Sequence, residues 1–152
     1  MSVIYTGPYA DQIGQHEGYE AQVLRDGSLS GTRTKPFVGY VAVCECGWQG
    51  ETRYPPTEEG ADEALAEWRS KHLRPLITAT HLGWPDWAER VAARATTIAG
   101  HVGDGRFDTA VLVLERLAED VQTWARSARA LADGEDMSVD LGLDDSTTGG
   151  AR

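Results

Sequence analysis

Residues 37–54 read FVGYVAVCECGWQGETRY and combine a strong strand signal with the two cysteines of the chain. Residues 37–43 are rich in β-branched and aromatic side chains, which favour a strand, and residues 48–54 can return as its hairpin partner. Cys44 and Cys46 then lie in the turn, where Gly47 permits a tight backbone that lets two sulfurs point at one ion. The stretch therefore predicts a β-hairpin with a metal-binding knuckle.

A helix follows the hairpin and leads back to the cysteines. Thr57 is a good N-cap, two acidic residues follow it, and we expect the helix to end before Pro75. About six residues of strand lead away from the knuckle for about 20 Å, and about 15 residues of helix return about 22 Å. We therefore expect His72 to lie beside both cysteines. The inward positions of this helix are spaced three or four residues apart: Ala61, Ala64, Leu65, Trp68 and His72.

A closed structural zinc site needs four ligands, and Cys44, Cys46 and His72 supply three. His81, just beyond the expected end of the helix, is the first candidate for the fourth. His16, upstream of the first strand, is the second. If neither reaches the site, a water molecule or a nearby carboxylate such as that of residue 45 can complete the shell. The sequence thus predicts a structural zinc ion as the cofactor.

The same residues also have interpretations without a metal. Thiols can be small buried hydrophobes, and a histidine under a tryptophan can be an ordinary core residue. A strained disulfide between Cys44 and Cys46, or a redox role, is a further alternative. An enzyme would need these cysteines and His72 to hold a reactive metal or to act as nucleophile and base, and no general acid or base stands out among the many acidic residues. We therefore expect a protein that is not an enzyme.

The segments around the hairpin complete an α+β fold. Residues 19–24 alternate and predict a third strand, and residues 26–36 a polar loop. The first fifteen residues show no periodicity. We expect an irregular segment at 1–17, then a ββα domain like that of zinc fingers at 18–76, in which a small antiparallel hairpin or three-stranded sheet packs against a helix.

Residues 77–132 predict a long antiparallel helical hairpin. A connector at 76–83 leads to a helix from Pro85 to about Ala99, and a glycine-rich turn follows at 100–105. The next helix has a longer apolar seam at heptad spacing: Phe107, Ala110, Leu114, Leu117, Val121, Trp124, Ala128 and Leu131. Because the seam outruns its neighbour, its far end needs the ββα unit or a second chain. We predict that a protein partner or a second copy binds there, through Leu117, Val121, Trp124, Ala128 and Leu131.

Charge is unevenly distributed along the chain. The formal net charge is −10, and residues 133–152 hold six acidic residues against one arginine, which predicts a disordered acidic tail. The folded part keeps the remaining −5, which argues against a surface that follows nucleic-acid phosphates. The start of the chain has no apolar run of a signal peptide, and no segment approaches the ~20 apolar residues of a membrane span. We therefore expect a cytoplasmic protein.

The knuckle and the helices together resemble a family of uncharacterised actinobacterial proteins. The resemblance lies in YVAVCECGWQG at 40–50, PPTEE at 55–59, the stretch from Glu67-Trp68 to HLRPL at 72–76, and the long helix at 112–131. Members of that family look like a Cys-x-Cys-Gly-Trp zinc-finger-like module joined to a helical pair, commonly followed by a helix-turn-helix. The resemblance implies that Cys44, Cys46 and His72 are metal-site positions. After Leu131, however, this chain has an acidic tail in place of a DNA-reading helix.

Two classes of function fit these features. The first is a non-enzymatic, zinc-stabilised protein-interaction or regulatory module that docks a partner around Trp124. The alternative is a nucleic-acid-associated regulator that uses the ββα head as zinc fingers do, with binding that weakens steeply as salt is added. A metal-dependent enzyme is a third, more remote class.

Overall fold

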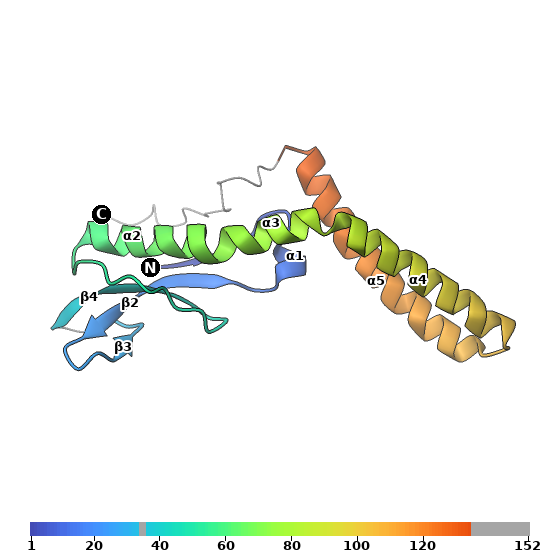
Figure 1. Cartoon of the computed structure of the whole chain (residues 1–152), viewed down its shortest axis with the longest axis horizontal. Coiled ribbons are helices and arrows are strands. Elements are labelled where there is room, and N and C mark those ends of the chain that lie inside the picture. The colour runs from blue at the N-terminus through green and yellow to red at the C-terminus, as the bar shows by residue number, and fades with distance from the viewer. Residues whose placement is uncertain (34–35, 135–152) are drawn as a thin grey trace, which may run out of the picture.

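The computed structural model describes residues 1–33 and 36–134 of the chain. A four-stranded antiparallel sheet packs against a long helical rod, and two further helices project together from the far end of that rod (Figure 1). This arrangement confirms the predicted α+β class, with a small antiparallel sheet, a packed helix and a helical pair. Beyond Gly134, the predicted acidic tail lies outside the described residues.

Strand β2 (Glu17–Leu24) is the middle of the sheet. Strand β4 (Phe37–Cys44) pairs antiparallel along one edge of β2, while β1 (Ser2–Ile4) and β3 (Leu29–Ser30) pair with the two halves of the other edge. The strands predicted at 19–24 and 37–43 are confirmed. The register sets Gly18 opposite Cys44, so the beginning of β2 lies beside the cysteine knuckle.

Residues 48–54 run back along β4, as predicted, but in an irregular form. Isolated bridges join Val43 to Gln49 and Tyr40 to Tyr54, and the Gly50 N–H donates to the Ala42 carbonyl at 2.8 Å. The backbone also passes very close to the rod, because a Cβ added at Gly50 would come within 2.6 Å of a carboxylate oxygen of the rod. The hairpin partner therefore exists without a regular ladder.

The rod is one continuous helix made of α2 (Glu58–Glu67), a π-helical turn η1 (Trp68–Leu73) and α3 (Arg74–Leu82). Thr57 caps it as predicted, since its hydroxyl accepts from the Gly60 N–H at 3.1 Å. The expected end before Pro75 is wrong, and the expected connector at 76–83 is mostly helical. A proline lacks the N–H for the carbonyl four residues back and crowds that carbonyl. In the wider turn the Arg74 N–H reaches the Arg69 carbonyl five residues back, and this shift lets the helix pass the proline.

The beginning of the chain is more ordered than expected. The segment predicted to be irregular contains β1 and a one-turn helix, α1 (Ala10–Ile13). Tyr5 is 4% exposed and Tyr9 is fully buried. Contacts with distant parts of the chain hold these side chains in place, which is why local periodicity does not reveal them.

Helices α4 (Trp84–Gly103) and α5 (Phe107–Ala132) form the predicted antiparallel pair. Pro85 lies in the first turn of α4, as expected. This helix runs past its predicted end near Ala99, because a glycine inside a helix costs only about 1 kcal/mol. Within the described residues, no helix has the length and low polarity that crossing a membrane requires.

One core connects the sheet, the rod and the base of the helical pair. The indole of Trp68, fully buried, lies so close to Gly18 that an added Cβ would approach it to 2.1 Å. At the other end, Trp124 packs against Tyr9 and the tryptophans of α4. The buried members of this core are Tyr5, Tyr9, Ala42, Cys44, Ala64, Trp68, Leu73, Ile77 and Trp124.

Candidate metal centre

Four side chains from four parts of the fold meet at one end of the sheet. His16 directly precedes β2, Cys44 ends β4, Cys46 lies in the knuckle and His72 lies in η1. One donor atom from each of these residues lies within 4.8 Å of all the others. The structure thus brings together Cys44, Cys46 and His72, as the sequence predicted, and adds His16 as the fourth.

His81, the first candidate for the fourth ligand, lies outside this group. Its Nδ1 is 2.8 Å from the hydroxyl of Tyr9. The expectation depended on a helix end at Pro75, after which the chain could turn back. Instead the helix continues, and at about 1.5 Å per residue it takes His81 about 13 Å further along the axis than His72.

His16 reaches the site through the register of the sheet. Because Gly18 is opposite Cys44 in an antiparallel pair, position 16 comes level with position 46 across the two strands. The sequence signals the strand at 19–24 but not its register against residues 37–44. The pairing of these two strands is the signal that would have favoured His16.

Three of the six distances between donor atoms are close to those of a tetrahedral zinc shell. His16 Nδ1 lies 3.5 Å from Cys44 Sγ and 3.2 Å from His72 Nε2. Cys46 Sγ lies 3.2 Å from His72 Nε2. With Zn–S bonds of about 2.3 Å and Zn–N bonds of about 2.0 Å, tetrahedral angles place sulfur and nitrogen about 3.5 Å apart and two nitrogens about 3.3 Å apart. The four side chains could therefore hold a metal ion such as zinc.

A backbone contact gives His16 the tautomer that a metal needs. His16 Nε2 lies 3.0 Å from the carbonyl oxygen of Ile13, which can only accept, so Nε2 bears a proton. In the neutral ring, the lone pair then sits on Nδ1, which faces the other three donors. A backbone carbonyl on the far nitrogen is a common partner of a metal-bound histidine. The hydrogen bond to the Ile13 carbonyl thus orients His16 so that its Nδ1 can coordinate a metal.

An aromatic neighbour positions the His72 ring, and burial favours the neutral form of that ring. Its ring stacks on Trp48, with ring centroids 4.8 Å apart and planes 14° apart. Burial lowers the pKa of His72, and repulsion from the nearby His16 ring, when that ring is protonated, lowers that pKa further. A lower pKa favours the neutral imidazole, which is the form that binds metals.

The two thiols differ in their surroundings and are not joined in a disulfide. Cys44 is 1% exposed, whereas Cys46 is exposed. Burial raises the pKa of the Cys44 thiol, although the backbone N–H of Cys46 opposes this rise. A bound divalent cation would overcome the effect of burial and favour the thiolate. Gly47, with φ of 96°, ends the turn that contains both cysteines, and its N–H donates to the Cys44 carbonyl at 2.9 Å.

The five residues predicted to bind a partner fall into two groups. Leu117 and Trp124 are buried against the rest of the chain, and Leu131 is half-buried beside the core. Trp124 stacks on one tryptophan of α4, with ring centroids 5.2 Å apart, and meets another edge-on at 4.5 Å. Val121 and Ala128 are exposed. The buried group is therefore covered within the same chain.

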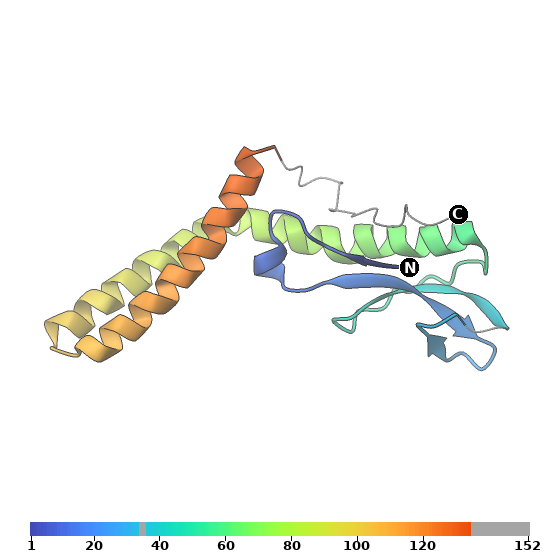
Figure 2. The ribbon, with the colours of Figure 1, turned by 180° about the vertical axis from the view of Figure 1, so that it is seen from behind.

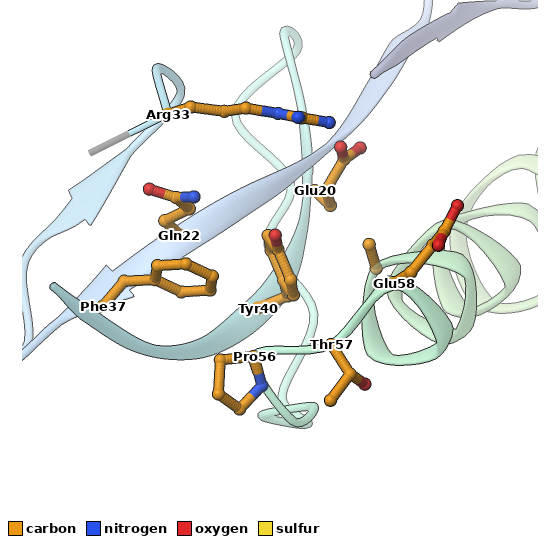
Figure 3. A pocket seen from close by; sticks show the side chains of 9 residues that line it. Glu20, Gln22, Arg33, Phe37, Tyr40, Pro56, Thr57 and Glu58 are labelled. Carbon is orange, nitrogen blue, oxygen red and sulfur yellow. The ribbon is translucent and has the colours of Figure 1, made fainter. Parts of the chain in front are cut away.

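A pocket of about 420 Å³ lies away from the cysteines, between the sheet and the beginning of α2 (Figure 3). The Glu20 carboxylate in its wall is nine-tenths buried and pairs with the amino group of Met1. The Thr57 hydroxyl already caps α2. The described residues that line the pocket include no histidine, so no imidazole base lies beside the Thr57 hydroxyl. Its nine lining residues are Glu20, Gln22, Arg33, Phe37, Tyr40, Pro56, Thr57, Glu58 and Ala61.

No family model, curated protein or solved structure matches this chain. The cluster of two histidines and two cysteines is consistent with a zinc-binding module.

Proposed function

We propose that this protein is a non-enzymatic interaction module in which a structural zinc ion joins the sheet to the rod. The observation that supports this most is the convergence of His16, Cys44, Cys46 and His72, whose donor atoms all lie within 4.8 Å of one another. With four protein ligands the shell is closed, so no position is open for a substrate or a reactive water. A closed shell favours a structural role over a catalytic one.

The position of the ion explains what it would do for the fold. His16 and His72 are 56 residues apart in the sequence, so the ion would tie the beginning of β2 to the rod and to the knuckle. The sheet needs such support, because β1 has three residues and β3 has two. Small sheets gain stability from packing or a metal, and the free energy of metal binding then contributes to folding.

The projecting helices support the interaction role. Helices α4 and α5 extend well beyond the sheet and the rod, and both views show their outer parts uncovered (Figures 1 and 2). Exposed apolar surface of this extent is typical of binding sites. The exposed large apolar side chains on these two helices are Val102, Phe107, Val111, Leu112, Leu114 and Val121.

Metal analysis of the purified protein and of its histidine variants tests the ligand set. We expect one zinc ion per chain in the unaltered protein and its loss in His16→Ala and in His72→Ala. His81→Ala and His101→Ala are matched controls outside the cluster and should keep the ion. Unaltered protein without bound metal, or equal loss from all four variants, would refute the proposed centre.

A further inference from the structure

Helix α5 has a second apolar stripe beside the one that packs inside the chain. The packed stripe includes Ala110, Leu117, Trp124 and Ser127, all buried. At 100° per residue, the second stripe lies about 90° further round the helix. It repeats at steps of four and three, and all its members are exposed: Phe107, Val111, Leu114, Ala118, Val121, Ala125 and Ala128.

Helix α4 has a matching stripe of smaller residues. Viewed from the N-terminus of each helix, this stripe is offset from the packed side of α4 in the same rotational direction as the second stripe is offset from the packed side of α5. Because the two helices are antiparallel, the same sense of rotation places both stripes on one side of the pair. The stripe on α4 is also exposed and consists of Ala88, Ala92, Ala95, Ala99 and Val102. We call the seven residues on α5 and these five on α4 the apolar face.

The opposite side of the helical pair is mostly polar, although Leu112 of α5 is exposed there. Arg94 lies 3.3 Å from Asp120 there, and the indole N–H of Trp87 donates to the same carboxylate at 3.1 Å. The pair is thus amphipathic as a unit, with an internal seam, a mostly polar side, and an uncharged apolar face without a covering element in the described part of the chain.

We propose that the apolar face docks onto the same face of a second copy, so that two helical pairs form a four-helix bundle. This proposal depends on the interaction role proposed above and not on the metal. Its first support is shape. With a twofold axis along the helices, α4 of each copy lies against α5 of the other. The larger members of the α5 stripe, Phe107, Val111, Leu114 and Val121, would then face the α4 stripe of the other copy, and small residues opposite large ones allow close packing.

The size of the face suits a stable dimer. Phe107 is 62% exposed, Val111 51% and Leu114 53%. If all twelve side chains became fully buried, each copy would bury at most roughly 700 Å², close to the ≈ 800 Å² per partner of a standard specific interface. Within residues 1–33 and 36–134, no element shields this surface from water, and exposed apolar surface of this kind is typical of binding sites.

Charge favours a second copy over a charged partner. Helices α4 and α5 with their turn, residues 84–132, contain seven acidic and six basic residues and so have a net charge of −1, although the whole chain has −10. No residue of the apolar face is charged. Two copies can therefore meet there without strong repulsion, whereas a basic or acidic partner would find no complementary charge.

Light scattering after size-exclusion chromatography, on the full chain over the micromolar to millimolar range, tests this proposal. We expect twice the mass of one chain. Leu114→Glu, in the middle of the apolar face, should reduce the mass to that of one chain. Leu112→Glu is the matched control, because Leu112 is 59% exposed but two residues, or 200°, away round the same helix. It should remain a dimer.

Circular dichroism and metal content, measured on the same samples, separate this proposal from the zinc centre. Both glutamate variants replace exposed side chains, so helix content should stay unchanged. A monomeric unaltered protein, a dimeric Leu114→Glu variant, or equal dissociation of both variants would overturn the dimer. A dimer without zinc would refute only the metal centre, and a zinc-loaded monomer would refute only the dimer.

Discussion

Gly18 in β2 lies directly beneath the indole ring of Trp68, next to the metal centre. An added Cβ would stand 2.1 Å from that ring, and the ring cannot retreat because it is fully buried. We expect Gly18→Ala to lower the free energy of unfolding by about 1–3 kcal/mol, as overpacking does. Denaturant unfolding measures this change.

Gly100→Ala is the matched control for that substitution. Gly100 is exposed within α4, and an added Cβ would meet no atom within 4 Å. Because alanine favours a helix, this variant should be more stable by about 0.4–1 kcal/mol. Similar losses of stability in both variants would contradict the close contact between Gly18 and Trp68.

Three of the four metal-site residues follow from the sequence alone. The Cys-x-Cys-Gly spacing and the length of strand and helix bring Cys44, Cys46 and His72 together without knowledge of the sheet. His16 does not follow, since its place depends on the register between two strands, which tertiary contacts decide. His81 was preferred because a proline usually ends a helix, and here a π-helical turn keeps the helix intact.

Helix α5 shows how one element can offer two faces. The predicted seam contains two sets of residues, and the structure turns one set inward and the other outward. Leu117 and Trp124 are buried, whereas Leu114 and Val121 are exposed. Both sets are apolar at heptad spacing, so periodicity cannot distinguish them. The aromatic cluster at the base of α4 determines which set faces inward, because Trp124 packs between Tyr9 and the tryptophans of α4.

Replacing leucine by alanine should have different effects on the buried and the exposed side of α5. Leu117 is 9% exposed, so Leu117→Ala should remove about 2–4 kcal/mol from the free energy of unfolding through the lost contacts and the cavity left behind. Leu112→Ala, on the outer side of α5, should change it by less than about 0.5 kcal/mol. Thermal or denaturant unfolding distinguishes these values. Equal effects would mean that α5 packs in another rotation.

The sheet, the rod and the helical pair share one core, which runs from Cys44 to Trp124. Tyr9 connects its two ends. The hydroxyl of Tyr9 accepts a hydrogen bond from the Trp84 indole N–H at 2.9 Å and lies 2.8 Å from His81 Nδ1. The overall class and the helical pair were predictable from periodicity, but this connection was not, because it joins residues 75 positions apart. A metal ion at one end of the core should therefore stabilise the entire chain.

X-ray absorption at the zinc edge, on protein purified without chelators, measures the ligands of the ion. We expect two sulfur atoms at about 2.3 Å and two nitrogen atoms at about 2.0 Å, from Cys44, Cys46, His16 and His72. A protein without bound zinc, or an ion surrounded by oxygen and nitrogen without sulfur, would contradict a structural centre at the end of the sheet.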